Sequence, residues 1–179
     1  MLLAGGPPTA SRVLDFGRAS GDSLAFFAER ASQLRILDAA DGLSALAGRP
    51  GDGDEAPSPA GPEAFRALFP ELAGERFGVV LLWDCLNLLP PADLRGFFRF
   101  LREHLHDGWC GHAFVLQKAQ GTERLRSFGL CGDGALRLVA EERAALRAHS
   151  RKALGDAMAP LRIDHAVLRG DGRQELLLR

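Results

Sequence analysis

The residues with the clearest potential for chemistry lie between Val13 and Gly21, which read Val-Leu-Asp-Phe-Gly-Arg-Ala-Ser-Gly. This pattern predicts a strand, a tight turn and the start of a helix. Gly17 allows positive φ, and Ala19 and Gly21 keep side chains short where a ligand would approach the main chain. The helix N-terminus would offer free N–H groups to a carboxylate or phosphate. An ordinary strand-to-helix turn also favours Gly, Ser and Asp, so both interpretations stay open.

The spacing of this turn argues against two common phosphate-binding motifs. A dinucleotide fingerprint needs a third small residue at position 22, so that helix and strand can pack closely. Position 22 is Asp, which disfavours NAD. A Walker A loop is absent, because the sequence contains no Gly-Lys-Ser or Gly-Lys-Thr.

A second acidic position, Asp38, ends the next predicted strand, Leu34–Leu37. In nucleotide-type sites a carboxylate at the tip of the strand beside the first one holds the ribose diol. A charged carboxylate can accept both hydroxyl hydrogen bonds. The alternative is that Asp38 or Asp41 only caps the short helix that follows.

Alternating strands and helices must position these residues. The predicted strands are Ser11–Phe16, Leu34–Leu37, Gly78–Trp83, Ala113–Gln117, Leu161–Leu168 and Gln174–Leu178; the predicted helices are 22–32, 63–72, 91–105 and 138–154. Asp171-Gly172 between the last two strands is a hairpin signal. We therefore predict an α/β three-layer sandwich: a mainly parallel twisted sheet, helices on both faces and a C-terminal antiparallel hairpin. The helix after Pro91 carries three phenylalanines, at 97, 98 and 100, and we expect that they cannot all face inward.

Composition and charge limit the class of protein. The chain of 179 residues suits a single domain, 1–179, in which the Pro- and Gly-rich segment 48–62 predicts a mobile acidic loop. A net charge of −1 argues against a strong basic field for nucleic acid, and no apolar stretch is long enough for a membrane span. Three cysteines without paired spacing predict neither disulfides nor zinc, and favour the reducing cytoplasm. The scattered histidines give no reason to expect a metal.

The chain resembles the class I S-adenosylmethionine-dependent methyltransferases, which are Rossmann-like. The turn Asp15-x-Gly17-x-Ala19-x-Gly21 is similar to their Asp/Glu-x-Gly-x-Gly-x-Gly motif. Residues 76–84 look like their fourth strand and the terminal hairpin like their sixth and seventh, so the resemblance covers about 11–118 and 161–178. It implies S-adenosylmethionine as cofactor, held by Asp15, Gly17, Arg18, Ala19, Gly21 and Asp38. Arg18 either pairs with the methionine carboxylate or fills the pocket.

Several departures from the family pattern suggest a degenerate member. A third strand is not evident between 37 and 78, so we expect it to be missing or eroded; Asp52 or Asp54 of the loop could replace its acidic end. Ala19 stands where the family has its middle glycine. Asp84 is the candidate catalytic residue, touching substrate or acting as a base, with a helix-cap or loop role as the alternative. Cys85 and Trp83 are interpreted as core residues.

Two hypotheses follow from this pattern. In the first, the protein is a methyltransferase that acts on a small molecule or a protein, with a lid from segment 48–62 or 119–137. In the second, it is a catalytically inactive scaffold or regulatory protein on the same fold, which acts through protein contacts as a homo-oligomer or complex component. Intact Asp15 and Asp38 favour the first, and the departures from the motif favour the second.

Overall fold

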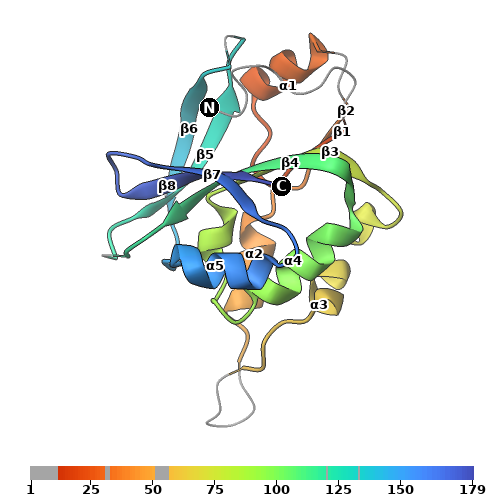
Figure 1. Ribbon diagram of the computed structural model, residues 1–179. Coiled ribbons are helices and arrows are strands. Elements are labelled where there is room, and N and C mark those ends of the chain that lie inside the picture. The colour runs from red at the N-terminus through yellow and green to blue at the C-terminus, as the bar shows by residue number, and fades with distance from the viewer. Residues whose placement is uncertain (1–11, 31–32, 51–56, 120, 133) are drawn as a thin grey trace.

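The computed structural model describes residues 12–30, 33–50, 57–119, 121–132 and 134–179. Its main sheet has six strands in the order β2-β1-β3-β4-β8-β7 (Figure 1). The strands are β1 (Arg12–Asp15), β2 (Gln33–Ile36), β3 (Phe77–Trp83), β4 (Leu105–Leu116), β7 (Ile163–Leu168) and β8 (Arg173–Leu178). The first four are parallel, and β8 pairs antiparallel with both β4 and β7. This confirms the predicted mainly parallel sheet with a C-terminal antiparallel hairpin.

The central strand β3 explains why the sheet is buried on both faces. Its sequence Phe-Gly-Val-Val-Leu-Leu-Trp is almost entirely apolar, as is typical of a strand covered from both sides. Val80 and Leu82 point into a core on one face, while Val79 and Leu81 point into a second core on the other.

Four helices cover one face of the sheet: α2 (Ala40–Ala47), α3 (Pro62–Leu68), α4 (Leu94–Glu103) and α5 (Arg151–Met158) (Figure 1). Two short 3-10 helices flank β3 in the chain: η1 (Pro70–Leu72) lies between α3 and β3, and η2 (Cys85–Leu88) lies between β3 and α4. The expectation that the α4 phenylalanines cannot all face inward is wrong, because Phe97, Phe98 and Phe100 are all buried. The helix contacts α3 and α5 as well as the sheet, so more than one of its sides is covered.

The other face carries α1 (Gly21–Ala28) and a separate two-stranded sheet, β5 (Arg124–Leu130) with β6 (Leu136–Arg143). The predicted helix 138–154 is therefore wrong in its first half: residues 136–143 form β6, and the helix begins only after Ser150, whose side chain caps it. Phe128 and Leu130 of β5 pack with Phe26 of α1. The β5–β6 hairpin thus completes the cover of this face beside α1.

Strand β2 forms an edge of the main sheet, in agreement with the expectation that the family's third strand is missing. Among the described residues, no strand pairs with the outer side of β2. Instead α2 begins two residues after Asp38 and lies on the face that also carries α3, α4 and α5, where its Leu43 is buried. Asp52 and Asp54 lie outside the described residues. None of the described helices combines the length and apolar character needed to cross a membrane.

Candidate functional site at the carboxyl edge of the sheet

Asp15, the last residue of β1, organises the turn into α1. Its side chain is fully buried, and its Oδ1 accepts hydrogen bonds from the Gly17 amide at 2.7 Å and the Trp83 indole Nε1 at 2.6 Å. The second carboxylate oxygen, Oδ2, has no partner. Burial raises the pKa of Asp15 to about 6, although both hydrogen bonds act to lower it.

Position 17 requires a glycine because a neighbouring side chain leaves no room for a Cβ, and not because of its backbone φ angle. The expectation of positive φ at Gly17 is wrong, since positive φ occurs at Trp83 and Asp38 but not at this glycine. A Cβ added to Gly17 would lie 2.6 Å from the Trp83 ring. The turn therefore needs a glycine because the indole, which is 1% exposed, packs directly against it. This burial agrees with the interpretation of Trp83 as a core residue.

The helix after the turn begins earlier than predicted. Ser20 is the N-cap of α1, and its Oγ accepts a hydrogen bond from the Ser23 amide at 3.1 Å, so neither Asp22 nor Ser23 caps the helix. Gly21 is the first helical residue, and no atom lies within 4 Å of the position of a Cβ there. Ala19 is exposed just before the cap. The Gly21 position is thus uncrowded, while β5 packs beside it: a Cβ on Gly129 would lie 3.0 Å from Ser20 Oγ and 3.1 Å from Asp22 Cβ.

Asp38 lies beside this turn. Its amide donates to the Gly17 carbonyl at 3.2 Å, and the Ala39 amide donates to the Phe16 carbonyl at 3.1 Å. The N-cap of α2 is Ala39, without a side-chain cap, so Asp38 does not cap that helix; Asp41 lies in its first turn. The Asp38 side chain is 57% exposed, with its backbone at φ 46°. Asp15, Gly17 and Asp38 are therefore brought together, as predicted, with Asp38 accessible.

Arg18 spans the gap between the turn and the β5–β6 hairpin. Its Nε lies 3.6 Å from the Asp38 carboxylate, and its Nη1 donates to the Glu142 carboxylate of β6. Both partners hold the pKa of Arg18 above its usual range. The side chain remains 41% exposed, so these contacts are made at the surface, where ion pairs are weak.

Asp84 follows β3 and is sealed from solvent. Its carboxylate is fully buried and lies within 3.1 Å of Arg126 Nε from β5 and 3.3 Å of Arg173 Nε from β8. The Arg126 amide also donates to it at 3.1 Å. Burial still raises the pKa of Asp84 despite these cationic partners. In this arrangement Asp84 anchors the β5–β6 hairpin to the sheet.

Arg126 is itself enclosed by aromatic rings. Its guanidinium lies 5.1 Å from the ring centroid of Phe114 and 5.0 Å from that of Phe128, and it also pairs with Asp171. Phe128 in turn packs against Trp83, with ring centroids 5.5 Å apart. The sequence does not predict this network, although the alternating Arg-Leu-Arg at 124–126 is a signal for a strand there.

Other reactive side chains make no second site. Cys85 is buried with its pKa raised by burial, in agreement with its interpretation as a core residue. His112 is buried on β4, with Nε2 3.1 Å from the Glu175 carboxylate on β8. In the part of the chain that the structure describes, no three His, Cys, Asp or Glu side chains are placed to hold a metal.

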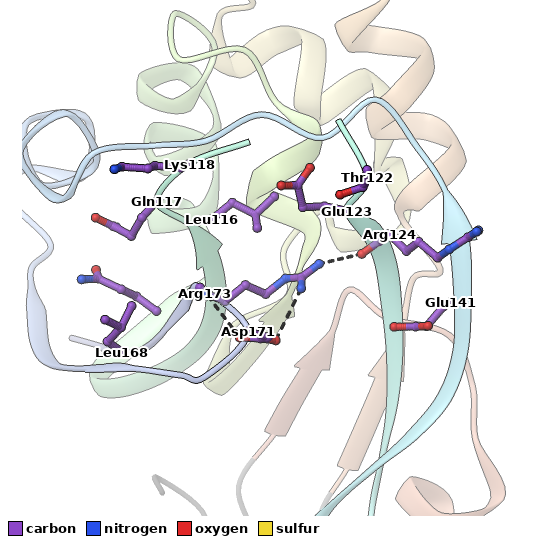
Figure 2. Close-up of a pocket in the computed structure, with 12 residues that line it drawn as sticks. Leu116, Gln117, Lys118, Thr122, Glu123, Arg124, Glu141, Leu168, Asp171 and Arg173 are labelled. Atoms are coloured by element: carbon purple, nitrogen blue, oxygen red, sulfur yellow. Dashed lines mark hydrogen bonds and ion pairs between the residues drawn. The ribbon is translucent and has the colours of Figure 1, made fainter. Parts of the chain in front are cut away.

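A cavity of about 720 Å³ lies at the same edge of the sheet, near the ends of β4 and β8. The order of strands puts it on the far side of β3 from the β1–α1 turn. It is formed by residues 116–118 after β4, 122–124 at the start of β5, Glu141 of β6, Leu168, and the turn 171–174 before β8 (Figure 2). Arg173 crosses it and donates to the Arg124 carbonyl at 2.7 Å.

Comparison with known structures identifies the type of fold. No protein-family model matches the chain, and no curated protein sequence matches it significantly. The structure is similar to that of 1,6-didemethyltoxoflavin-N1-methyltransferase from Burkholderia thailandensis, with TM-score 0.50 and 18% identity over 95% of this chain and 71% of that one. It also matches the CcbJ methyltransferase of Streptomyces caelestis, with TM-score 0.45 and 14% identity over 98% and 91%. The chain has a class I methyltransferase-like fold.

Proposed function

We propose that this protein binds S-adenosylmethionine at the β1–α1 turn and the tip of β2, and transfers its methyl group to a small molecule or a protein at the same edge of the sheet. The observation that supports this most is the convergence of the turn with Asp38. The Asp38 amide bonds to Gly17, and its carboxylate stays accessible. A carboxylate in that place can accept both hydroxyls of a ribose.

The residues of this site suit the cofactor at three points. Asp15 Oδ2 is a buried acceptor without a partner, which is available to a donor of the ligand or to a bound water. Apart from its own helix and its chain neighbours, nothing lies within 4 Å of a Cβ built at Gly21, in the first turn of α1, where helix N–H groups favour a carboxylate. Arg18 must leave Asp38 for a ribose to bind, and its exposed side chain then suits the ligand carboxylate.

In this proposal the protein acts by binding and orientation. S-adenosylmethionine, when bound, supplies an electrophilic methyl group. Asp38 fixes the ribose, the β1–α1 turn fixes the methionine end, and the β5–β6 hairpin shields the edge from water. Because two arginines neutralise Asp84, it reaches a substrate as a base only after Arg126 withdraws. We therefore assign methyl transfer to orientation rather than to proton removal by Asp84.

Titration calorimetry with S-adenosylhomocysteine tests the binding step. The wild type should bind, and Asp38→Asn should weaken binding roughly tenfold, since one charged hydrogen-bond acceptor contributes about 1.5 kcal/mol. Asp41→Asn is the matched control, because Asp41 is also exposed and lies three residues away. An equal loss of affinity in both variants, or no heat of binding with the wild type, would contradict the proposal.

A second candidate is a catalytically inactive protein that acts through contacts with a partner. Two contacts favour it: Arg18 pairs with Asp38, and Arg126 and Arg173 seal Asp84. The outer strand β6 would then offer a contact surface, with Leu138 and Val139 about half exposed. Absence of S-adenosylhomocysteine binding in a folded wild-type protein would select this candidate.

A further inference from the structure

Arg173 forms the floor of the cavity beside β4 and β8. The Arg173 side chain is 7% exposed and pairs with both Asp84 and Asp171. Its Nη2 donates to the Arg124 carbonyl at 2.7 Å, and Figure 2 shows this contact together with those to Asp171. Arg173 and Asp171 are therefore committed to the fold, so a ligand would be selected by other charges around the cavity.

Two charges that line this cavity have no partner. Lys118, after β4, and Glu141, on β6, are exposed, and their side chains make no hydrogen bond or ion pair with the residues that the structure describes. They lie on opposite sides of the cavity, while the Arg124 side chain points away from it (Figure 2). Glu123 also lines the cavity, and its carboxylate accepts a hydrogen bond from the Gly121 amide at 2.9 Å. Lys118 and Glu141 thus place one unpaired positive and one unpaired negative charge on opposite sides of the cavity.

The remaining lining is suited to amide groups. Gln117 and Gln174 each supply a donor and an acceptor, and Leu116 and Leu168 supply the apolar surface on which small side chains can rest. A volume of about 720 Å³ is in the usual range for small-molecule sites. A ligand that fills it should carry separated charges of opposite sign and hydrogen-bonding groups between them.

We propose that this cavity binds a short zwitterionic peptide of about three residues, with its carboxylate toward Lys118 and its ammonium toward Glu141. A free α-amino acid carries its two charges on the same short unit. An extended tripeptide spans about 10 Å, which separates its terminal charges. A role for this peptide as the methyl acceptor rests on the proposed function. Binding of the peptide in the cavity is independent of that function.

The test uses three synthetic ligands that differ only in their end groups: trialanine, N-acetyl-trialanine and trialanine amide. Binding is followed by calorimetry or by amide chemical shifts at low ionic strength. Trialanine should bind the wild type, and each cap should weaken binding about fivefold, the scale of one exposed ion pair. Glu141→Gln should abolish the effect of the acetyl cap only, and Lys118→Gln that of the amide cap only.

Arg151→Gln, on the exposed side of α5, is the control and should keep both differences. Absence of trialanine binding at about 10 mM, or equal binding of all three ligands at any detectable affinity, would overturn the proposal. Peptide binding without S-adenosylhomocysteine binding would uphold the site and remove its acceptor role. The reverse result would overturn the peptide site and leave the proposed function in place.

Discussion

The indole of Trp83 hydrogen-bonds to the carboxylate of Asp15 at 2.6 Å, between the last residues of neighbouring strands β3 and β1. The same carboxylate oxygen holds the Gly17 amide. Trp83 makes this contact from a backbone at φ 49°, a conformation that a bulky residue rarely adopts. The turn proposed to bind the cofactor is therefore shaped by a residue far away in the sequence.

Replacing Trp83 by Phe should destabilise the protein by about 1–3 kcal/mol more than the loss of packing alone, because the buried Asp15 carboxylate loses one of its two hydrogen-bond donors. Trp109→Phe is the matched control: Trp109 is also buried, and its indole has no hydrogen bond with the described residues. Urea denaturation of both variants, followed by circular dichroism, gives the difference. Equal destabilisation would show that the Trp83–Asp15 bond contributes little.

Gly17→Ala and Gly21→Ala should have opposite effects. At Gly17 the new methyl group meets the Trp83 ring at 2.6 Å, and such overpacking costs about 1–3 kcal/mol. At Gly21, in the first turn of α1, there is open space, so alanine should be neutral or stabilising by up to about 1 kcal/mol. Melting temperatures of the two variants check this, and a stable Gly17→Ala would contradict the close packing described.

Asp15 should make the free energy of unfolding fall as pH rises from about 4 to about 6. The folded protein keeps the Asp15 proton up to about pH 6, whereas the unfolded chain releases it near 3.8. In this interval the folded state binds more protons, so the contribution of Asp15 decreases with pH, by about 3 kcal/mol in total.

The measurement is the difference in stability between the wild type and Asp15→Asn from pH 4 to pH 7. Other carboxyl groups, such as Asp93 and Glu175, have lowered pKa values and act in the opposite direction, but their effects cancel in this difference. The stability of Asp15→Asn relative to the wild type should increase as pH rises to about 6. A difference in the free energy of unfolding that stays constant across this range would contradict the prediction.

Arg126→Met should destabilise the protein by roughly 3–5 kcal/mol, because it removes a partner from the fully buried Asp84 carboxylate. The double variant Arg126→Met, Asp84→Asn should recover part of this loss, since the buried charge is gone. Arg137→Met is the control on the same hairpin. Its ion pair with Asp22 is exposed and should contribute no more than about 1 kcal/mol. Similar losses for Arg126→Met and Arg137→Met would contradict the anchoring role of Asp84.

Local patterns in the sequence were sufficient to predict the sheet. The apolar run 78–83 and the Asp-Gly turn at 171–172 locate β3 and the β7–β8 hairpin, because each depends on neighbouring residues. The β5–β6 hairpin was not predicted: β6 is mostly exposed and rich in charge, so its composition is also typical of a solvated helix. Its strand form depends on pairing with β5 and on packing of Phe128, which are tertiary effects.

In the candidate site, too, some features follow from local sequence and others depend on tertiary contacts. The convergence of Asp15, Gly17 and Asp38 follows from strand order, since the carboxyl ends of neighbouring parallel strands meet at one edge. The partners of these residues could not be predicted. Arg18 meets Glu142, and Asp84 meets Arg126, through an inserted hairpin whose position no local pattern encodes.

The most direct test of the proposed cofactor site is backbone hydrogen–deuterium exchange with and without S-adenosylhomocysteine. The account predicts slower exchange at residues 16–21 and 37–40, where the turn and the tip of β2 meet, and unchanged exchange in α4. No change at either segment under conditions where the folded protein is saturated with millimolar ligand, or protection confined to other regions, would contradict the assignment of this edge as the cofactor site.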